Sequence, residues 1–156
     1  MSQRFEITTQ NRVQEESFAT DILIVCDRCG KDAVLVGLRG TTPQISFVEE
    51  ASCAHCGRVW QVKPPTRSSS DDGSLPRYQW LKLWLSTDFR GHRLWAYNEQ
   101  HLCWLESFIG AEIREDKLAG GSSALHAILP RWMTSSKNRD DVIAALAKLR
   151  KKLPAR

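Results

Sequence analysis

Two short cysteine motifs of the same form constrain this chain more than any other feature. They read Cys26-Asp27-Arg28-Cys29-Gly30 and Cys53-Ala54-His55-Cys56-Gly57, and 23 residues separate Cys29 from Cys53. A Cys-x2-Cys turn places two thiolates on one side of a metal ion, and two such turns complete the tetrahedron that zinc prefers. The glycine after each pair permits positive φ, so that backbone N–H groups can point at the sulfurs. The motifs therefore predict one structural zinc ion bound by Cys26, Cys29, Cys53 and Cys56.

Other interpretations of the cysteines explain less of the pattern. Four unrelated buried thiols would make the paired spacing and the two glycines coincidental. A redox Cys-x2-Cys needs only one pair with a helix after it, whereas strand-like sequence follows both pairs here. His55 is not needed as a ligand, because four cysteines already fill the tetrahedron, and we expect an exposed side chain.

The sequence around the cysteines is typical of short strands. Apolar, mostly β-branched runs occur at 22–25, 33–38, 45–48 and 59–62. A Gly/Thr/Pro turn signal at 40–43 separates the middle two runs. We therefore expect an antiparallel zinc-binding unit at residues 21–63, after a polar lead-in at residues 1–20.

Two cysteine pairs around a hairpin, ending in Cys56-Gly57-Arg58-Val59-Trp60, resemble the zinc ribbons of transcription factors, including the elongation-factor type. The resemblance covers about residues 22–63 and implies a ribbon fold with bound zinc. Elongation-factor ribbons carry an acidic pair at the hairpin tip. The tip here, from Arg39 to Gln44, has no acidic residue, and Glu49-Glu50 lies near the second cysteine pair instead. A role in polymerase cleavage is therefore not implied.

The whole chain also resembles a group of bacterial proteins known only as zinc-ribbon-containing. The similar blocks are Leu-Trp-Ala-x-Asn-x2-His-Leu, from Leu94 to Leu102, and Leu-Pro-x-Trp-Met, from Leu129 to Met133. This resemblance implies no activity.

A segment rich in Pro, Ser and Asp at residues 64–75 has nothing to bury, so we expect an exposed linker there. Residues 76–156 predict an αβ module, and the fold class of the whole chain is predicted to be α+β. Its expected strands are 80–85 and 94–97, with a turn at 90–92 between them. The later tryptophans, Trp80, Trp84, Trp95, Trp104 and Trp132, predict an aromatic core for this module.

Two helices are expected to follow the strand pair. Asn98 is a good N-cap for a helix from Glu99 to about Glu115. A second helix begins near Asn138, with Asp141 in an approximate capping box, and has an apolar face made by Val142, Leu146, Leu149 and Leu153. The segment between the helices, residues 116–135, is expected to be a loop.

The basic residues gather at the C-terminal end. Residues 131–156 carry eight basic and two acidic side chains, whereas residues 21–63 carry five of each. Candidate phosphate contacts are Lys148, Arg150, Lys151 and Lys152. The alternative is ordinary helix electrostatics, since Asp140 and Asp141 at the start and cations at the end complement the macrodipole.

We expect a non-enzymatic zinc-ribbon binding protein that contacts nucleic acid within a larger complex. The alternative is a protein–protein interaction adaptor that docks through its aromatic-rich C-terminal module. Steeply salt-dependent binding to nucleic acid would distinguish the first from the second.

A catalytic centre is not expected, because the sequence has no phosphate loop, nucleophile elbow or His-Glu metal motif. His101 and Cys103 are two residues apart on a helix and face different directions, so we interpret them as a surface or capping histidine and a core thiol. His92 completes no metal or nucleophile set with them. We expect the solvated face of the first helix to carry Glu106, Glu112, Glu115 and Asp116.

The sequence contains no span approaching the roughly 20 apolar residues that cross a bilayer. The first 20 residues lack the apolar core of a signal peptide. A cytoplasmic protein with no membrane partner is therefore expected, and its cysteines fit metal ligands and free thiols better than a disulfide framework.

Overall fold

The computed structural model describes residues 4–7, 21–36, 49–62, 81–111, 113–116 and 129–155. For residues 4–7 and 113–116 it describes the backbone only. The strands are β1 (Arg4–Ile7), β2 (Asp21–Val25), β3 (Asp32–Val36), β4 (Glu49–Ser52), β5 (Val59–Val62), β6 (Leu85–Phe89), β7 (His92–Ala96) and β8 (Ile113–Asp116). The helices are α1 (Glu99–Gly110), α3 (Arg131–Thr134), the 3-10 helix η2 (Ser136–Asn138) and α4 (Arg139–Lys151). Antiparallel strands carry the cysteines, and a strand pair with helices follows, which confirms the α+β class.

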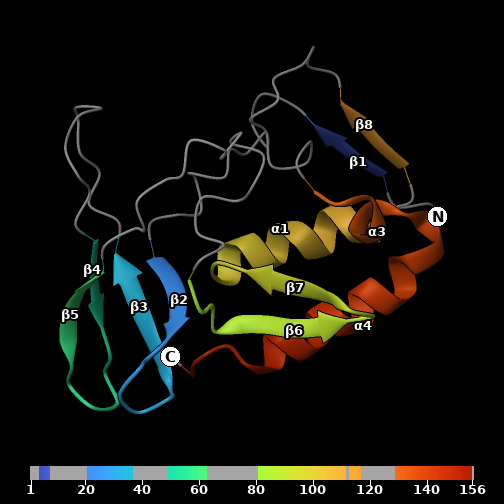
Figure 1. Ribbon diagram of the computed structural model, residues 1–156. Helices are drawn as coiled ribbons and strands as arrows, with labels where there is room; N and C mark the ends of the chain where they lie inside the picture. The colour runs from blue at the N-terminus through green and yellow to red at the C-terminus, as the bar shows by residue number, and fades with distance from the viewer. Residues whose placement is uncertain are drawn as a thin grey trace, which may run out of the picture.

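The first sheet has the antiparallel order β2-β3-β4-β5, and we call it the cysteine-bearing sheet (Figure 1). One cysteine motif joins β2 to β3 and the other joins β4 to β5, so both turns lie at the same end of the sheet. The side chains of Ile22, Leu35 and Ala51 share one face and are fully buried. The expected run at 45–48 and the hairpin tip fall outside the described residues, as does the linker at 64–75.

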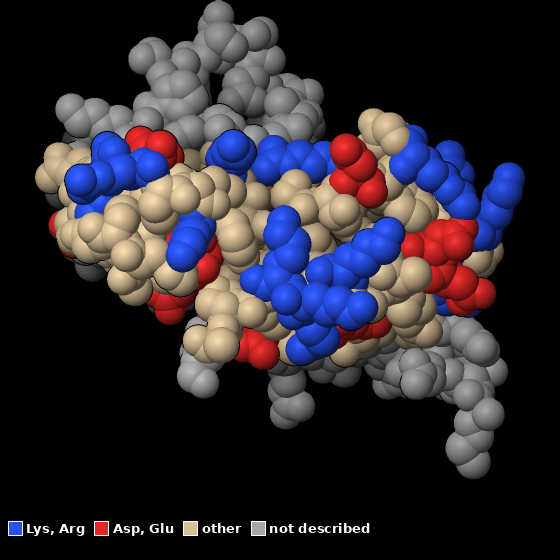
Figure 2. Space-filling view, turned by 90° about the horizontal axis from the view of Figure 1, so that it is seen from below, with Lys and Arg blue, Asp and Glu red and all other residues tan. Residues whose placement is uncertain are grey.

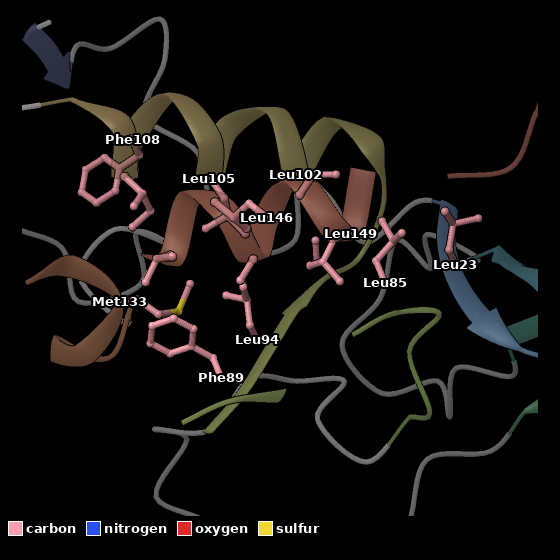
Figure 3. Close-up of a cluster of buried hydrophobic side chains, with 14 residues drawn as sticks. Leu23, Leu85, Phe89, Leu94, Leu102, Leu105, Phe108, Met133, Leu146 and Leu149 are labelled. Carbon is pink, nitrogen blue, oxygen red and sulfur yellow. The ribbon is translucent and has the colours of Figure 1, made fainter. Parts of the chain in front are cut away.

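The second part of the fold is the β6–β7 hairpin with α1 and α4 packed against it (Figure 1). Leu94 of β7, Leu105 of α1 and Leu146 of α4 meet in its core, and none of them is more than 1% exposed (Figure 3). Arg90 and Gly91, at φ 48° and 82°, form the tight turn between the strands. Two consecutive residues with positive φ are the signature of a hairpin turn that matches the strand twist.

The first hairpin strand is not where the sequence predicts it. The apolar run at 80–85 predicts a strand, but β6 begins only at Leu85. Residues 82–84 instead extend along the free edge of β2, through Val25 N–H to Lys82 O (2.9 Å) and Trp84 N–H to Leu23 O (3.0 Å). Leu83 is thereby buried against the cysteine-bearing sheet. The apolar run is buried in part, as a strand would be, but Leu83 packs against the cysteine-bearing sheet rather than within the hairpin.

The start of α1 forms a second joint between the two parts. The Asn98 side chain accepts the His101 N–H (2.9 Å), which confirms the predicted N-cap, and donates to Asp21 O of β2 (3.3 Å). His101 Nδ1 accepts the Tyr97 N–H (3.1 Å), and Tyr97 O accepts the Leu23 N–H (2.7 Å). Asn98 and His101 of the Leu94–Leu102 block therefore both take part in this joint.

The ends of the helices differ from the predicted ends. α1 stops at Gly110 rather than near Glu115, because the backbone becomes extended at Ala111. Ile113–Asp116 forms β8, which pairs in parallel with β1, so the expected lead-in contains a strand. Part of the expected loop at 116–135 is helical, as α3.

α4 lacks the predicted capping box. It starts after Asn138, whose side chain makes no cap hydrogen bond. That side chain instead accepts from Arg90 and donates to Trp132 O, both at 3.0 Å, while Asp141 forms an ion pair with Arg90. These contacts tie the start of α4 to the hairpin turn. In the part of the chain that the structure describes, no helix combines the length and the apolarity needed to cross a bilayer.

Candidate metal centre

The four cysteines of the two motifs converge on one point. Their Sγ atoms all lie within 4.8 Å of one another, with Cys26 to Cys56 at 3.8 Å and Cys29 to Cys53 at 3.5 Å. A tetrahedron with Zn–S bonds of about 2.3 Å has S···S edges of about 3.8 Å. A disulfide would need a separation near 2.05 Å. The arrangement therefore fits a four-coordinate metal ion, and the predicted ligand set is brought together as a group that could hold one.

The two motifs adopt the same backbone turn. Gly30 and Gly57 have φ of 74° and 72°, as the glycine argument requires. In each turn the glycine N–H donates to the carbonyl of the first cysteine, at 2.9 Å in both cases. A Cβ atom at either glycine would meet no atom within 4 Å, so the positive φ, not a lack of space, favours glycine.

The pKa values of the Cys26 and Cys29 thiols are shifted in opposite directions. Backbone N–H groups, that of Cys29 foremost, lower the pKa of Cys26 to about 7, although desolvation opposes this. The Lys31 N–H lowers the pKa of Cys29, but desolvation and the neighbouring cysteine sulfurs outweigh it and raise the pKa to about 11. A second thiolate beside the first is thus disfavoured unless a cation compensates, which is the role of a bound metal.

Two polar contacts link the second cysteine motif to the first motif and the strand after it. His55 forms a hydrogen bond with Asp32, the first residue of β3 (Nε2–Oδ1, 2.8 Å), and Arg58 forms an ion pair with Asp27 of the first motif (Nη1–Oδ1, 3.1 Å). Arg58 also lies over the Trp60 ring, at 5.2 Å. His55 is exposed, as expected, and its contact with Asp32 helps to hold the two halves of the site together.

The four basic candidates of the C-terminal helix end separate into two groups. Arg150 faces α1, where its Nε and Nη2 contact the Glu106 carboxylate at 2.9 and 2.5 Å. Lys152 lies toward β6, where its Nζ donates to Ser86 O at 3.0 Å and lies 5.4 Å from the Trp84 ring. Lys148 and Lys151 are exposed and make no ion pair with a described residue. Arg150 is therefore already neutralised, whereas the three lysines are not.

Of two predictions about single residues of α1, the one for Cys103 is wrong and the one for His101 holds in its capping alternative. Cys103, expected to be a core thiol, is exposed and lies 3.2 Å from Arg150 Nη2. His101, expected at the surface or as a cap, is a cap but is 1% exposed. Burial lowers its pKa to about 3. Glu106, expected on a solvated face, is the partner of Arg150, while Glu112 lies outside the described residues.

The aromatic residues serve mainly as packing. Trp84, Trp104 and Trp132 are half-buried against the core of the hairpin and helices, and Trp95 packs toward the cysteine-bearing sheet. His92 stacks on Trp132, with ring centroids 4.7 Å apart, and Trp80 lies outside the described residues. The buried core of the hairpin and helices is mostly aliphatic, and the tryptophans pack at its edge, so the prediction of an aromatic core is wrong for the described part of the module.

Comparison with protein-family models, with curated proteins and with solved structures finds no match to this chain. What can be said of its function therefore rests on its own residues.

Proposed function

We propose that this protein is a non-enzymatic zinc-ribbon protein that contacts nucleic acid through the surface at the end of its last helix. The metal proposal follows from the donor set. Four thiolates are the soft, closed set that selects zinc in structural sites and leaves no coordination position for a reacting water. The zinc would stabilise the cysteine-bearing sheet, because ligation energy is folding energy in a small site.

One observation carries the nucleic-acid proposal. Lys148, Lys151 and Lys152 are exposed and lie in the last turn and at the C-cap of α4, and none of them forms an ion pair with a described carboxylate. Figure 2 shows lysine and arginine side chains gathered over the middle of this face of the molecule. Clustered cations without counter-charges attract a polyanion and release its condensed counterions.

The test is oligonucleotide binding as a function of salt. A 20-nucleotide single strand is titrated by fluorescence anisotropy between 50 and 200 mM NaCl, against wild type and a Lys148→Gln, Lys151→Gln double variant. Each phosphate that a cation neutralises on a single strand contributes roughly 0.7 to the log–log slope of affinity against salt. We therefore expect weaker binding and a slope shallower by roughly 1.4 in the double variant.

The matched control is Arg131→Gln with Lys137→Gln. These two cations are also exposed and also lack a described carboxylate partner, but they lie before α4 rather than at its end. The control variant should keep the wild-type slope. A wild type that binds no oligonucleotide at 50 mM NaCl would refute the nucleic-acid proposal and leave the adaptor interpretation.

A further inference from the structure

Two cations converge on one serine of β6. Arg93 of β7 donates from Nε to Ser86 Oγ at 2.9 Å, and Lys152 donates from Nζ to Ser86 O at 3.0 Å. Ser86 thus contacts both cations, the guanidinium through its hydroxyl and the ammonium through its carbonyl. No carboxylate forms an ion pair with either cation among the described residues.

Neutral groups hold both cations in position. Arg93 Nη2 also donates to Leu81 O at 3.3 Å, and the Lys152 ammonium lies over the Trp84 ring. Trp84 is fixed in turn, since its Nε1 donates to Lys152 O at 2.7 Å. Burial lowers the pKa of Lys152, as expected where no counter-charge compensates the desolvation.

Two further exposed lysines belong to the elements that hold this pair. Lys148 precedes Lys152 by four residues and so lies on the same side of α4. Lys82 is exposed and follows Leu81, the residue whose carbonyl accepts from Arg93. Asp88, the cross-strand partner of Arg93, is the nearest acidic residue on this hairpin face, yet it makes no ion pair with Arg93. The cluster therefore has an excess of positive charge at its centre.

We propose that Arg93, Lys152 and the Ser86 hydroxyl form a binding site for one phosphate group. Like charges held together repel each other, and an anion between them removes that cost. A guanidinium fork, an ammonium and a hydroxyl supply several donors, which suits the oxygens of a phosphate. This site adds detail to the proposed function. The assignment of its phosphate to a nucleic-acid backbone rests on that function.

The site differs from the sequence prediction in its members. Arg93 lies on the hairpin, 55 or more positions before the predicted basic run, and Arg150 of that run has no part in the site. The backbone of a bound strand would thus cross from the end of α4 to β6 and β7.

The test compares Arg93→Gln with Arg131→Gln, which removes one exposed positive charge elsewhere. The probes are the 20-nucleotide strand, a peptide nucleic acid of the same sequence with its neutral backbone, inorganic phosphate, and phosphatidylglycerol vesicles. Without the Arg93 guanidinium, oligonucleotide affinity should fall roughly eightfold at 50 mM salt and the slope should be shallower by roughly 0.7. Arg131→Gln should change neither, Arg93→Lys should recover part of the affinity, and the peptide nucleic acid should not bind.

Failure of the site and failure of the proposed function are distinguishable. If wild type binds the oligonucleotide and Arg93→Gln binds it equally, with the same slope, the phosphate site is refuted and the proposed function stands. If wild type binds no oligonucleotide but binds inorganic phosphate or the vesicles in an Arg93-dependent way, the site stands and its phosphate comes from another source. If no probe depends on Arg93, the site is overturned.

Discussion

Acid should destabilise this protein through His101, which is buried at the start of α1. Its pKa is about 3 in the folded protein, against 6.5 for an ordinary histidine, because burial disfavours the imidazolium. The folded state therefore keeps His101 neutral at pH values where the unfolded chain has taken up a proton. The contribution to stability is complete above pH 6.5 and is lost as the pH falls from 6.5 toward 3.

The magnitude follows from proton linkage. One proton bound only by the unfolded chain lowers the free energy of unfolding by about 1.4 kcal/mol per pH unit. Between pH 7 and pH 5 the decrease attributable to His101 is therefore about 2 kcal/mol. Replacement by Gln removes this titration, and Gln at the third helical position can still accept a backbone N–H at the helix start.

The assay is urea unfolding followed by far-UV circular dichroism, at pH 7 and pH 5, for wild type and His101→Gln. Acid also reprotonates the cysteine ligands, but this effect is common to both proteins and cancels in the difference between them. We expect wild type to lose about 2 kcal/mol more than the variant between the two pH values. Equal decreases in the two proteins would show that His101 does not titrate as its burial requires.

Two further changes test other contacts. Leu83→Ala opens a cavity at the joint, where Leu83 is 4% exposed, and should lower the free energy of unfolding by about 2–5 kcal/mol. In a urea titration of this variant, metal release and loss of helical dichroism should occur together. Separate transitions would show that the two parts do not depend on this joint. Arg150→Gln breaks the partly exposed pair with Glu106 and should lower stability by at most about 1 kcal/mol in thermal unfolding. The salt slope of oligonucleotide binding should not change. A shallower slope would show that Arg150 contacts the bound strand.

The metal site was predictable because its determinants are local. Ligand spacing and the glycine after each pair are properties of five consecutive residues, and the φ values of Gly30 and Gly57 agree with them. The cap by Asn98 and the apolar faces of α1 and α4 are local in the same sense. These features need no knowledge of what lies across the fold.

Pairing over long distances in the chain was not predictable in this way. The apolar run at 80–85 predicts an extended segment, but not that Leu83 pairs with Ile24 of β2. β8 pairs with β1 from the other end of the chain, so helical periodicity alone continued α1 too far. The same limit applies to Arg150, because the sequence indicates its helix face but not the Glu106 that α1 presents to it.

The measurement that most directly tests the central claim is the metal content of purified wild type, Cys53→Ser and Cys103→Ser by inductively coupled plasma mass spectrometry. Cys53 is one of the four converging thiols, whereas Cys103 is exposed on α1 and serves as the matched control. We expect about one zinc ion per chain in wild type and in Cys103→Ser, and a large loss of zinc in Cys53→Ser. Full zinc retention in Cys53→Ser, or a wild type that holds no zinc after purification with zinc present, would contradict the assignment of a zinc ribbon.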